Sequence, residues 1–238
     1  MNKKLLITLL LSSSAMMMIA APASAVQKND KTDVGVSFKS DGPVNPGETG
    51  PFKGNLSLIW KPSKFMFGEQ KALANKATFN NKVEGNQYIV ANDDRSSAES
   101  TAWKLSAQFT KLSTADGKDE LASNVSFVLG TAQSYNIGDA IDPETNDFIP
   151  NLPESPGALG TLNPGSGITV GDGSQEAVVL EAGNTTGKTI LEKKAKNDIT
   201  GGVATKLTDV KLTVMDSSKA QGKSYSGQVI WTMDDLAV

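Results

Sequence analysis

The residue types that most often perform chemistry are missing from this chain of 238 residues, because it contains neither histidine nor cysteine. Histidine is the usual general base, and imidazole and thiolate groups together make up ordinary zinc sites. Their absence excludes Ser-His-Asp and Cys-His nucleophilic arrangements. It also excludes disulfide bonds, so an exported form of the protein must rely on its packed core for stability.

Carboxylates remain as possible acids, bases or ligands. Adjacent pairs occur at Asp93-Asp94, Asp119-Glu120 and Asp234-Asp235. Glycoside hydrolysis needs two carboxylates that face each other across a cleft, whereas neighbours on a strand point to opposite faces. DPETND, residues 142–147, resembles part of a calcium loop but lacks its turn glycine and its closing glutamate. We expect no catalytic residue, no metal and no cofactor. A wall hydrolase that uses an acid pair is the enzymatic alternative.

AGNTTGKT, residues 182–189, is similar to a relaxed phosphate-binding loop. Such a loop joins a parallel strand to a helix, and the stretch KTILEKKAKN, residues 188–197, has a helix-like composition. However, Ala182 replaces the first glycine of the motif, and the rest of the chain has antiparallel patterns. We interpret residues 182–189 as an ordinary loop and residues 188–197 as the one helix candidate.

Residues 1–25 have the pattern of a secretory signal peptide. Lys3 and Lys4 precede an apolar run, and Ala23-Ser24-Ala25 forms a small-residue cleavage site. Cleavage after Ala25 would remove two lysines, which leaves a formal charge of 21 − 26 = −5. This acidic balance is a poor match to nucleic acids and to anionic lipids. We expect a secreted protein without a nucleic-acid partner and without direct membrane insertion.

Apolar residues alternate with polar ones in many short runs separated by Gly, Asn, Asp and Pro clusters. This period indicates half-buried strands and predicts an all-β fold, either an antiparallel Greek-key β-sandwich or a partly open barrel. Residues 138–174 are rich in proline and glycine and predict a long surface excursion with a short strand at Ile168 to Val170. We expect residues 26–32 to be a linker and residues 33–238 to form a single domain. The alternating groups are Val34, Val36 and Phe38; Leu56, Leu58 and Trp60; Tyr88 and Val90; Trp103, Leu105, Ala107 and Phe109; Val125, Phe127 and Leu129; Val210, Leu212 and Val214; and Tyr225, Val229, Trp231 and Met233.

Two of these runs contain a tryptophan followed two places later by a long apolar side chain. The candidate ligand-binding residues are Trp103, Leu105, Tyr225, Trp231 and Met233. In one alternative the rings fill the core, which is the commoner place for tryptophan on an alternating strand. In the other they form an exposed aromatic platform, to which Trp60 could contribute. If the two segments are neighbours, the last strand closes the domain onto an early one.

Trp103-Lys104-Leu105 and Trp231-Thr232-Met233 resemble the proximal and distal signatures of the WxL domain, a surface domain of low-GC Gram-positive bacteria. Tyr225 and Val229-Ile230 also match the distal signature, although Met233 replaces its leucine. GVSFKSDGP and LSLIWKPSKFMFGE resemble the N-terminal segments of the family. The resemblance covers roughly Asp33 to Leu236, and the protein is similar to the small, single-domain members of the family.

The resemblance implies non-covalent attachment to the cell wall at the extracellular surface, with peptidoglycan as ligand. It also implies assembly with other WxL-family surface proteins and a membrane-anchored partner, and contact with host extracellular matrix. Two binding mechanisms stay open. One is stacking of exposed aromatic rings on glycan. The other is protein–protein docking, in which the domain reaches the wall only through a partner and serves in adhesion.

Overall fold

The described part of the computed structural model consists of strands. It covers residues 27–36, 56–93, 95, 102–141, 148–163, 165–172, 177–194 and 201–236, and no helix occurs within these ranges. None of its segments could therefore cross a membrane as a long apolar helix. The strands are β1 (Gln27–Val36), β2 (Leu56–Trp60), β3 (Lys64–Met66), β4 (Ala77–Asn80), β5 (Gln87–Asp93), β6 (Trp103–Phe109), β7 (Leu112–Ser113), β8 (Glu120–Leu121), β9 (Ser123–Leu129), β10 (Gln133–Tyr135), β11 (Ala140–Ile141), β12 (Phe148–Ile149), β13 (Leu159–Thr161), β14 (Ile168–Val170), β15 (Val178–Glu181), β16 (Lys188–Lys193), β17 (Gly201–Val214) and β18 (Tyr225–Asp235).

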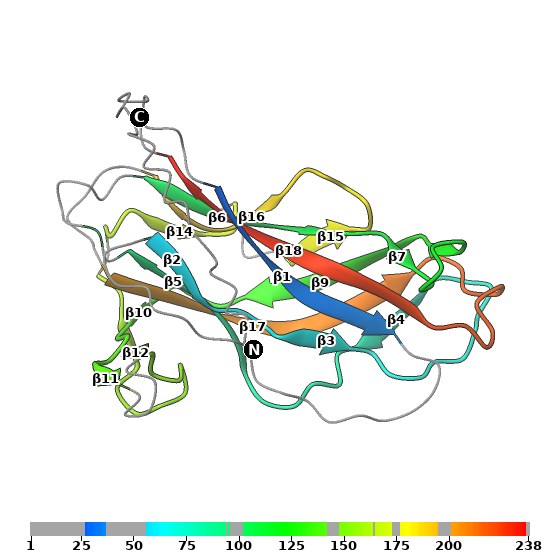
Figure 1. The fold of residues 1–238 in the computed structure, drawn as a ribbon, viewed down its shortest axis with the longest axis horizontal. Coiled ribbons are helices and arrows are strands. Elements are labelled where there is room, and N and C mark those ends of the chain that lie inside the picture. The colour runs from blue at the N-terminus through cyan, green and yellow to red at the C-terminus, as the bar shows by residue number, and fades with distance from the viewer. Residues whose placement is uncertain are drawn as a thin grey trace, which may run out of the picture.

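Two eight-stranded sheets face each other, and the β11–β12 hairpin lies beside them (Figure 1). Sheet A has the order β14-β16-β6-β18-β1-β3, with β7 paired to β18 and β8 paired to β7. Its strand pairs are antiparallel except for β1–β3, which is parallel. The last strand of the sequence therefore lies inside this sheet, between β6 and β1.

Sheet B is organised around the long strand β17. The first half of β17 pairs with β10 and β5, and its second half pairs with β9 and β4. The register shifts between Thr208 and Lys211, where Asp209 adopts a positive φ of 53°. This irregularity lets one strand serve both halves of the sheet. Strand β2 adds to β5, β13 adds to β10, and β15 adds to β9.

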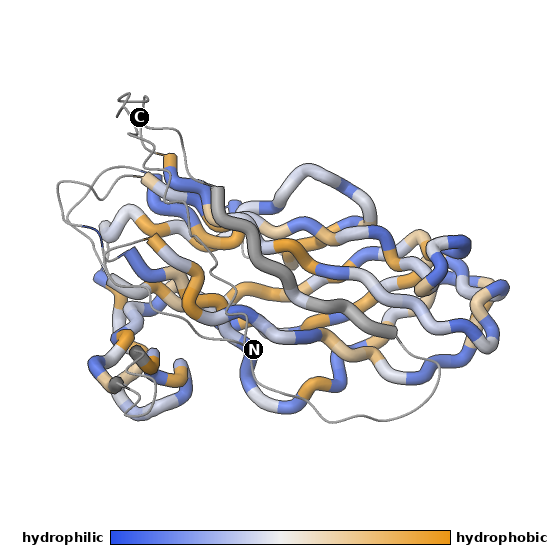
Figure 2. The backbone as a smooth tube through the Cα atoms, viewed as in Figure 1, coloured by the Kyte–Doolittle hydropathy of each residue, from blue (hydrophilic) through white to orange (hydrophobic). Residues whose placement is uncertain are grey.

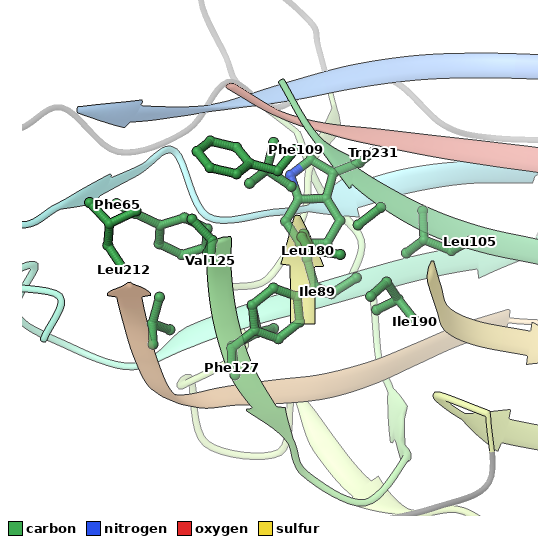
Figure 3. Close-up of a cluster of buried hydrophobic side chains, with 14 of the residues drawn as sticks. Phe65, Ile89, Leu105, Phe109, Val125, Phe127, Leu180, Ile190, Leu212 and Trp231 are labelled. Atoms are coloured by element: carbon green, nitrogen blue, oxygen red, sulfur yellow. The ribbon is translucent and has the colours of Figure 1, made fainter. Parts of the chain in front are cut away.

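The core fills the space between the two sheets, as the alternating side chains predicted. Figure 2 shows apolar positions alternating with polar ones along the strands. In Figure 3, Leu105 and Trp231 of sheet A point toward Ile89 and Phe127 of sheet B. These residues belong to one large buried cluster that draws on both sheets. The prediction of an all-β sandwich is confirmed, and so is the short strand at Ile168 to Val170.

Two expectations about secondary structure are wrong. The helix candidate at residues 188–197 begins as strand β16, Lys188–Lys193, which pairs with β6 and β14. Residues 27–32, assigned to a linker, are part of β1, which pairs with β18 along its whole length. Main-chain pairing to a strand with an apolar face overrides the polar composition of both segments. The signal peptide, residues 1–25, and the acidic stretch 142–147 lie outside the described residues.

Candidate functional site

The two tryptophan motifs lie side by side on neighbouring strands. Strands β6 and β18 pair antiparallel, with Trp231 opposite Ala107, Met233 opposite Leu105 and Asp235 opposite Trp103. The last strand thus closes the sandwich onto an early strand, as expected for neighbouring motifs. All the candidate ligand-binding residues are buried: the exposed fraction is 1% for Trp103, 0% for Leu105, 4% for Tyr225, 0% for Trp231 and 2% for Met233.

This burial corresponds to the core alternative for both tryptophans and leaves no exposed ring face at either motif. A sugar or protein side chain cannot stack on these rings while the sandwich stays closed. The arrangement of the motif residues is therefore that of structural side chains, and any contact surface must be formed by other residues.

Trp231 connects three separate segments of the chain. Its indole N–H donates a hydrogen bond to the hydroxyl of Thr32 in β1, and that hydroxyl donates in turn to the carbonyl of Pro62. Its ring also packs against Phe127 of sheet B, with a centroid distance of 6.2 Å. Thr32 is itself fully buried. The ring thus anchors the N-terminal strand through the one polar atom that it carries into the core.

Trp103 has a different environment. Its indole N–H is buried and has no hydrogen-bond partner among the described residues. The register places Trp103 next to Lys193 of β16 on one side and next to Asp235 of β18 on the other. Both neighbours belong to a cluster of charges at this end of the sandwich, which also includes Asp93 and Arg95.

We call Asp93, Arg95, Lys193 and Asp235 the charge cluster. Arg95 holds Asp93 through Nε and Nη2 at 2.7 and 3.0 Å, and its Nη1 contacts Asp235 at 2.7 Å. Lys193 Nζ lies 3.7 Å from Asp93 Oδ2, and the exposed fractions of these two side chains are 0% and 2%. The cluster joins β5 of sheet B to β16 and β18 of sheet A. The hydrogen bond to Asp93 raises the pKa of Arg95 despite its partial burial, and the bond to Asp235 acts in the same direction.

A second aromatic group lies on the outer face of sheet B. The register of β2 shifts between Leu58 and Trp60, so that Trp60 lies opposite Val90. Trp60 therefore packs with a second, smaller cluster and not with the main core. This outer cluster is built around buried Ile59, Val90, Tyr135, Ala158 and Ala204. The expectation that Trp60 shares a face with Leu56 and Leu58 is therefore wrong. A bulge, which alternation does not reveal, reverses its direction. The unbroken apolar run Leu58-Ile59-Trp60 was the available signal, because such runs indicate burial on both faces.

We call Trp60, Tyr88 and Tyr135 the outer aromatic group. The indole N–H of Trp60 donates to the hydroxyl of Tyr135 at 3.0 Å and to the carbonyl of Asn151 at 3.1 Å. Burial raises the pKa of Tyr135, against the lowering effect of the bond from Trp60. Burial also raises the pKa of Tyr88, and the charge of Glu154 adds to that effect. Trp60 and Tyr88 are each half-buried, so part of each side chain is accessible.

The proline-rich excursion covers part of this outer face. Asn136 N–H donates to the carbonyl of Ala158, and Asn151 N–H donates to that of Ile137, each at 2.8 to 2.9 Å. Pro150, Pro153 and Ala158 are buried, whereas Leu152 is 58% exposed. Residues 150–158 of the excursion therefore pack over sheet B and present Leu152 at the surface, whereas β13 and β14 are strands of the two sheets.

A groove of about 690 Å³ opens elsewhere, along the side where β14 ends sheet A and β15 ends sheet B. Its walls come from the end of β9, from β14, from the start of β15 and from the start of β16. No sequence pattern indicated this groove, because it lies at the edges of the two sheets, where β14 and β15 do not pair with each other.

The remaining motifs do not form a reactive site. Residues 182–189 connect β15 to the start of β16, and no helix follows them, so the phosphate-loop geometry is absent there. Asp119 pairs with Lys223 and Glu120 pairs with Lys111 at the surface. Asp93 and Asp235 share Arg95. Across the described ranges, no group of three or more acidic side chains could hold a metal ion.

Comparison with known proteins agrees with this arrangement. Residues 25–236 match the family described as "WxL domain surface cell wall-binding". No curated protein and no solved structure matches the chain. The match spans nearly the whole chain and includes both tryptophan strands, β6 and β18. The protein therefore belongs to the WxL family of surface, cell wall-binding domains.

Proposed function

We propose that the protein is a secreted, non-catalytic surface protein that attaches non-covalently to the Gram-positive cell wall, with peptidoglycan as its ligand. The observation that carries this proposal is the family match over residues 25–236. The state of the acidic pairs supports a binding role, since Asp119, Glu120, Asp93 and Asp235 are each engaged by a lysine or an arginine.

The outer aromatic group offers a surface for glycan contact. Trp60 and Tyr88 are partly accessible on one face of sheet B, whereas the tryptophans of the WxL motifs are buried. Partly exposed aromatic rings present an apolar surface beside a polar edge, which suits the faces of sugar rings. In this proposal the WxL motifs hold the fold, and Trp60 and Tyr88 make the contact.

Sedimentation with protein-stripped sacculi tests the proposal. We expect the wild-type protein to pellet and the Tyr88→Thr variant to pellet much less, because threonine keeps the strand but removes the ring. Leu73→Ala is the matched control, since Leu73 is an exposed apolar residue that the outer cluster does not include. Thermal unfolding followed by circular dichroism checks that both variants are folded. Failure of the wild-type protein to pellet would contradict direct wall binding.

A second candidate function is docking to other proteins, through which the domain would reach the wall. Its partners would be other WxL-family surface proteins and a membrane-anchored protein, with an adhesive role toward host extracellular matrix. The groove between β14 and β15, whose lining combines apolar side chains with Asp172 and Lys188, favours this candidate. Under this alternative, the protein would pellet with sacculi only when the partner protein has been added.

A further inference from the structure

Two segments of the chain bring a charge beside Tyr88 on the outer face of sheet B. The first is β17, where Lys206 lies directly opposite Tyr88 in the ladder with β5. Directly opposite side chains point to the same face, with Cβ atoms about 4.5–5.5 Å apart. The neighbours of Lys206 along the strand, Thr205 and Leu207, are buried, so the lysine points outward. Lys206 therefore places a cation beside the outer aromatic group.

The second charge comes from the excursion. Ser155 N–H donates to the carbonyl of Leu152 at 2.9 Å, which closes a β-turn with Pro153 and Glu154 at its centre. Pro153 is buried, so the turn is fixed on the sheet. The carboxylate of Glu154 lies close enough to Tyr88 to raise the pKa of the phenol, in addition to the larger effect of burial.

Neither charge is neutralised by another described residue. The ion pairs within the described ranges include neither Lys206 nor Glu154. By contrast, Lys111 and Glu120 pair with each other at the surface. Glu154 is exposed and Lys206 is partly exposed, so both can meet a ligand that lies on Tyr88. The outer face thus presents one cation and one anion beside the same aromatic ring.

Trp60 adds a ring whose orientation is fixed. Its indole N–H is shared between the hydroxyl of Tyr135 and the carbonyl of Asn151, and that hydroxyl donates to the same carbonyl. A ligand that packs on the ring therefore loses little affinity to ordering the side chain. Because Trp60 lies opposite Val90, it is a diagonal neighbour of Tyr88. The two rings and the two charges belong to one surface.

This combination distinguishes between the parts of a cell wall. A glycan strand of neutral N-acetylated sugars can cover the rings, but it leaves Lys206 and Glu154 without partners. Peptidoglycan also carries short peptides on its sugars, and these peptides contain carboxylates and free amino groups. A sugar with such a peptide offers an apolar ring face, an anion and a cation together, and charge complementarity of this kind gives specificity.

We propose that the outer face of sheet B binds the junction of sugar and peptide in peptidoglycan. The sugar packs on Trp60 and Tyr88, a carboxylate of the peptide lies beside Lys206, and an amino group of the peptide lies beside Glu154. The inference rests on the proposed function of direct wall binding and names the part of the wall that is recognised. The uncharged glycan is the poorer ligand.

Two soluble probes test this inference by NMR titration of isotope-labelled protein. One is a disaccharide of N-acetylglucosamine and N-acetylmuramic acid with a peptide that has a free lysine amino group and a free terminal carboxylate. The other is the same disaccharide without the peptide, with its own carboxylate amidated. We expect saturable shifts at the amides of residues 88, 154 and 206 with the first probe, and about tenfold weaker binding of the second. Equal affinities, or no saturable binding of the first probe, would overturn the proposal.

Two substitutions assign the charges. Lys206→Met and Glu154→Gln should each weaken binding of the peptide-bearing probe about threefold to fivefold and leave the neutral probe unaffected. The matched controls are Lys188→Met and Glu69→Gln, which make the same changes of charge at exposed positions in β16 and after β3, in sheet A. Neither control should change either affinity. Thermal unfolding checks that all four variants are equally folded.

Blocking the charges of the probe provides the complementary measurement. Acetylation of its amino group should weaken binding to the wild type but not to Glu154→Gln, and amidation of its terminal carboxylate should act in the same way with Lys206→Met. If blocking weakens binding to the variants as much as to the wild type, the assignment of the charges is wrong.

Sedimentation with sacculi separates this inference from the function on which it rests. If the wild-type protein pellets with sacculi but binds the two soluble probes equally, the inference fails and wall binding stands. If the wild-type protein does not pellet, the proposed function itself is contradicted. The two failures are therefore distinguishable.

Discussion

The regions around Trp231 and Trp103 differ in how they satisfy polar groups, although both rings are buried and lie on paired strands. The N–H of Trp231 has a partner in Thr32, and its surroundings are apolar. The N–H of Trp103 has no partner in the part of the chain that the structure describes, and its neighbours in register are Lys193 and Asp235 of the charge cluster. Both rings pack in the main core cluster, but the region of Trp231 satisfies its polar groups by hydrogen bonds through Thr32, whereas the region of Trp103 contains paired charges. Similar motifs in sequence therefore support the fold by different forces.

The largest loss of stability is expected when the ring of Trp231 is removed from the core. Trp231→Ala removes a buried ring and its bond to Thr32, and should lower the free energy of unfolding by about 3–5 kcal/mol. Chemical denaturation measures this loss. Wall binding should decrease only in proportion to the unfolded fraction. A folded variant with an unchanged melting temperature and no wall binding would show that Trp231 contacts the ligand and does not serve the core.

The contribution of the charge cluster beside Trp103 is tested by Asp93→Ala. This change removes the carboxylate that lies 3.7 Å from the buried Lys193 ammonium and the fork of bonds to Arg95, so the free energy of unfolding should fall by about 3–5 kcal/mol. The matched variant is Lys193→Met, which removes the buried ammonium and leaves Asp93 paired with Arg95. Its loss of stability in denaturant should be much smaller. Equal losses would mean that the Lys193–Asp93 pair, and not the unpaired charge, carries the stability.

A smaller effect is expected when Trp231 is made to resemble Trp103. Thr32→Val keeps the shape of the side chain but removes the hydroxyl, which leaves the indole N–H and the Pro62 carbonyl without this partner. The free energy of unfolding should fall by about 1–3 kcal/mol. The same change in a Trp231→Phe background should have a smaller cost. An identical cost in both backgrounds would indicate that the bond between Thr32 and Trp231 is not formed in solution.

The smallest difference in stability is expected between the phenylalanine variants of the two tryptophans. Trp231→Phe and Trp103→Phe remove similar apolar area, but only the first removes a hydrogen bond. The Trp231 variant should therefore be less stable than the Trp103 variant by about 1 kcal/mol. Parallel denaturation curves of the two variants measure the difference. A reversed order would mean that the indole N–H of Trp103 gains a partner in solution.

Local patterns in the sequence were sufficient to predict the all-β class, whereas the choice between a sandwich and a partly open barrel needed the structure. Alternation placed β6, β9 and β18 correctly, and even the short strand β14 followed from Ile168 and Val170 within a proline-rich stretch. Such patterns work because side chains two apart share one face of a strand. The strand assignments that failed depend on contacts between residues far apart in the chain.

Strand β16 shows why sequence alone was insufficient. Its composition suggested a helix, yet the segment forms a strand in which Lys193 is buried, with the carboxylate of Asp93, a hundred residues earlier, at 3.7 Å. Similarly, the polar strand β1 forms because β18 offers it a partner along its full length. The outer aromatic group depends on a bulge in β2 and on the excursion, neither of which has a periodic signal.

The position of β18 in sheet A has a consequence for how the chain folds. It lies between β6 and β1, with Trp231 bonded to Thr32, yet it follows every other described strand in the sequence. A chain that emerges from its N-terminus first cannot assemble the middle of this sheet until residues 225–235 have appeared. Until then β1 and β6 each lack the strand that joins them, whereas β16 and the strands of sheet B can already find their partners. Closure of sheet A would therefore be a late step in folding, because it joins residues from distant parts of the sequence.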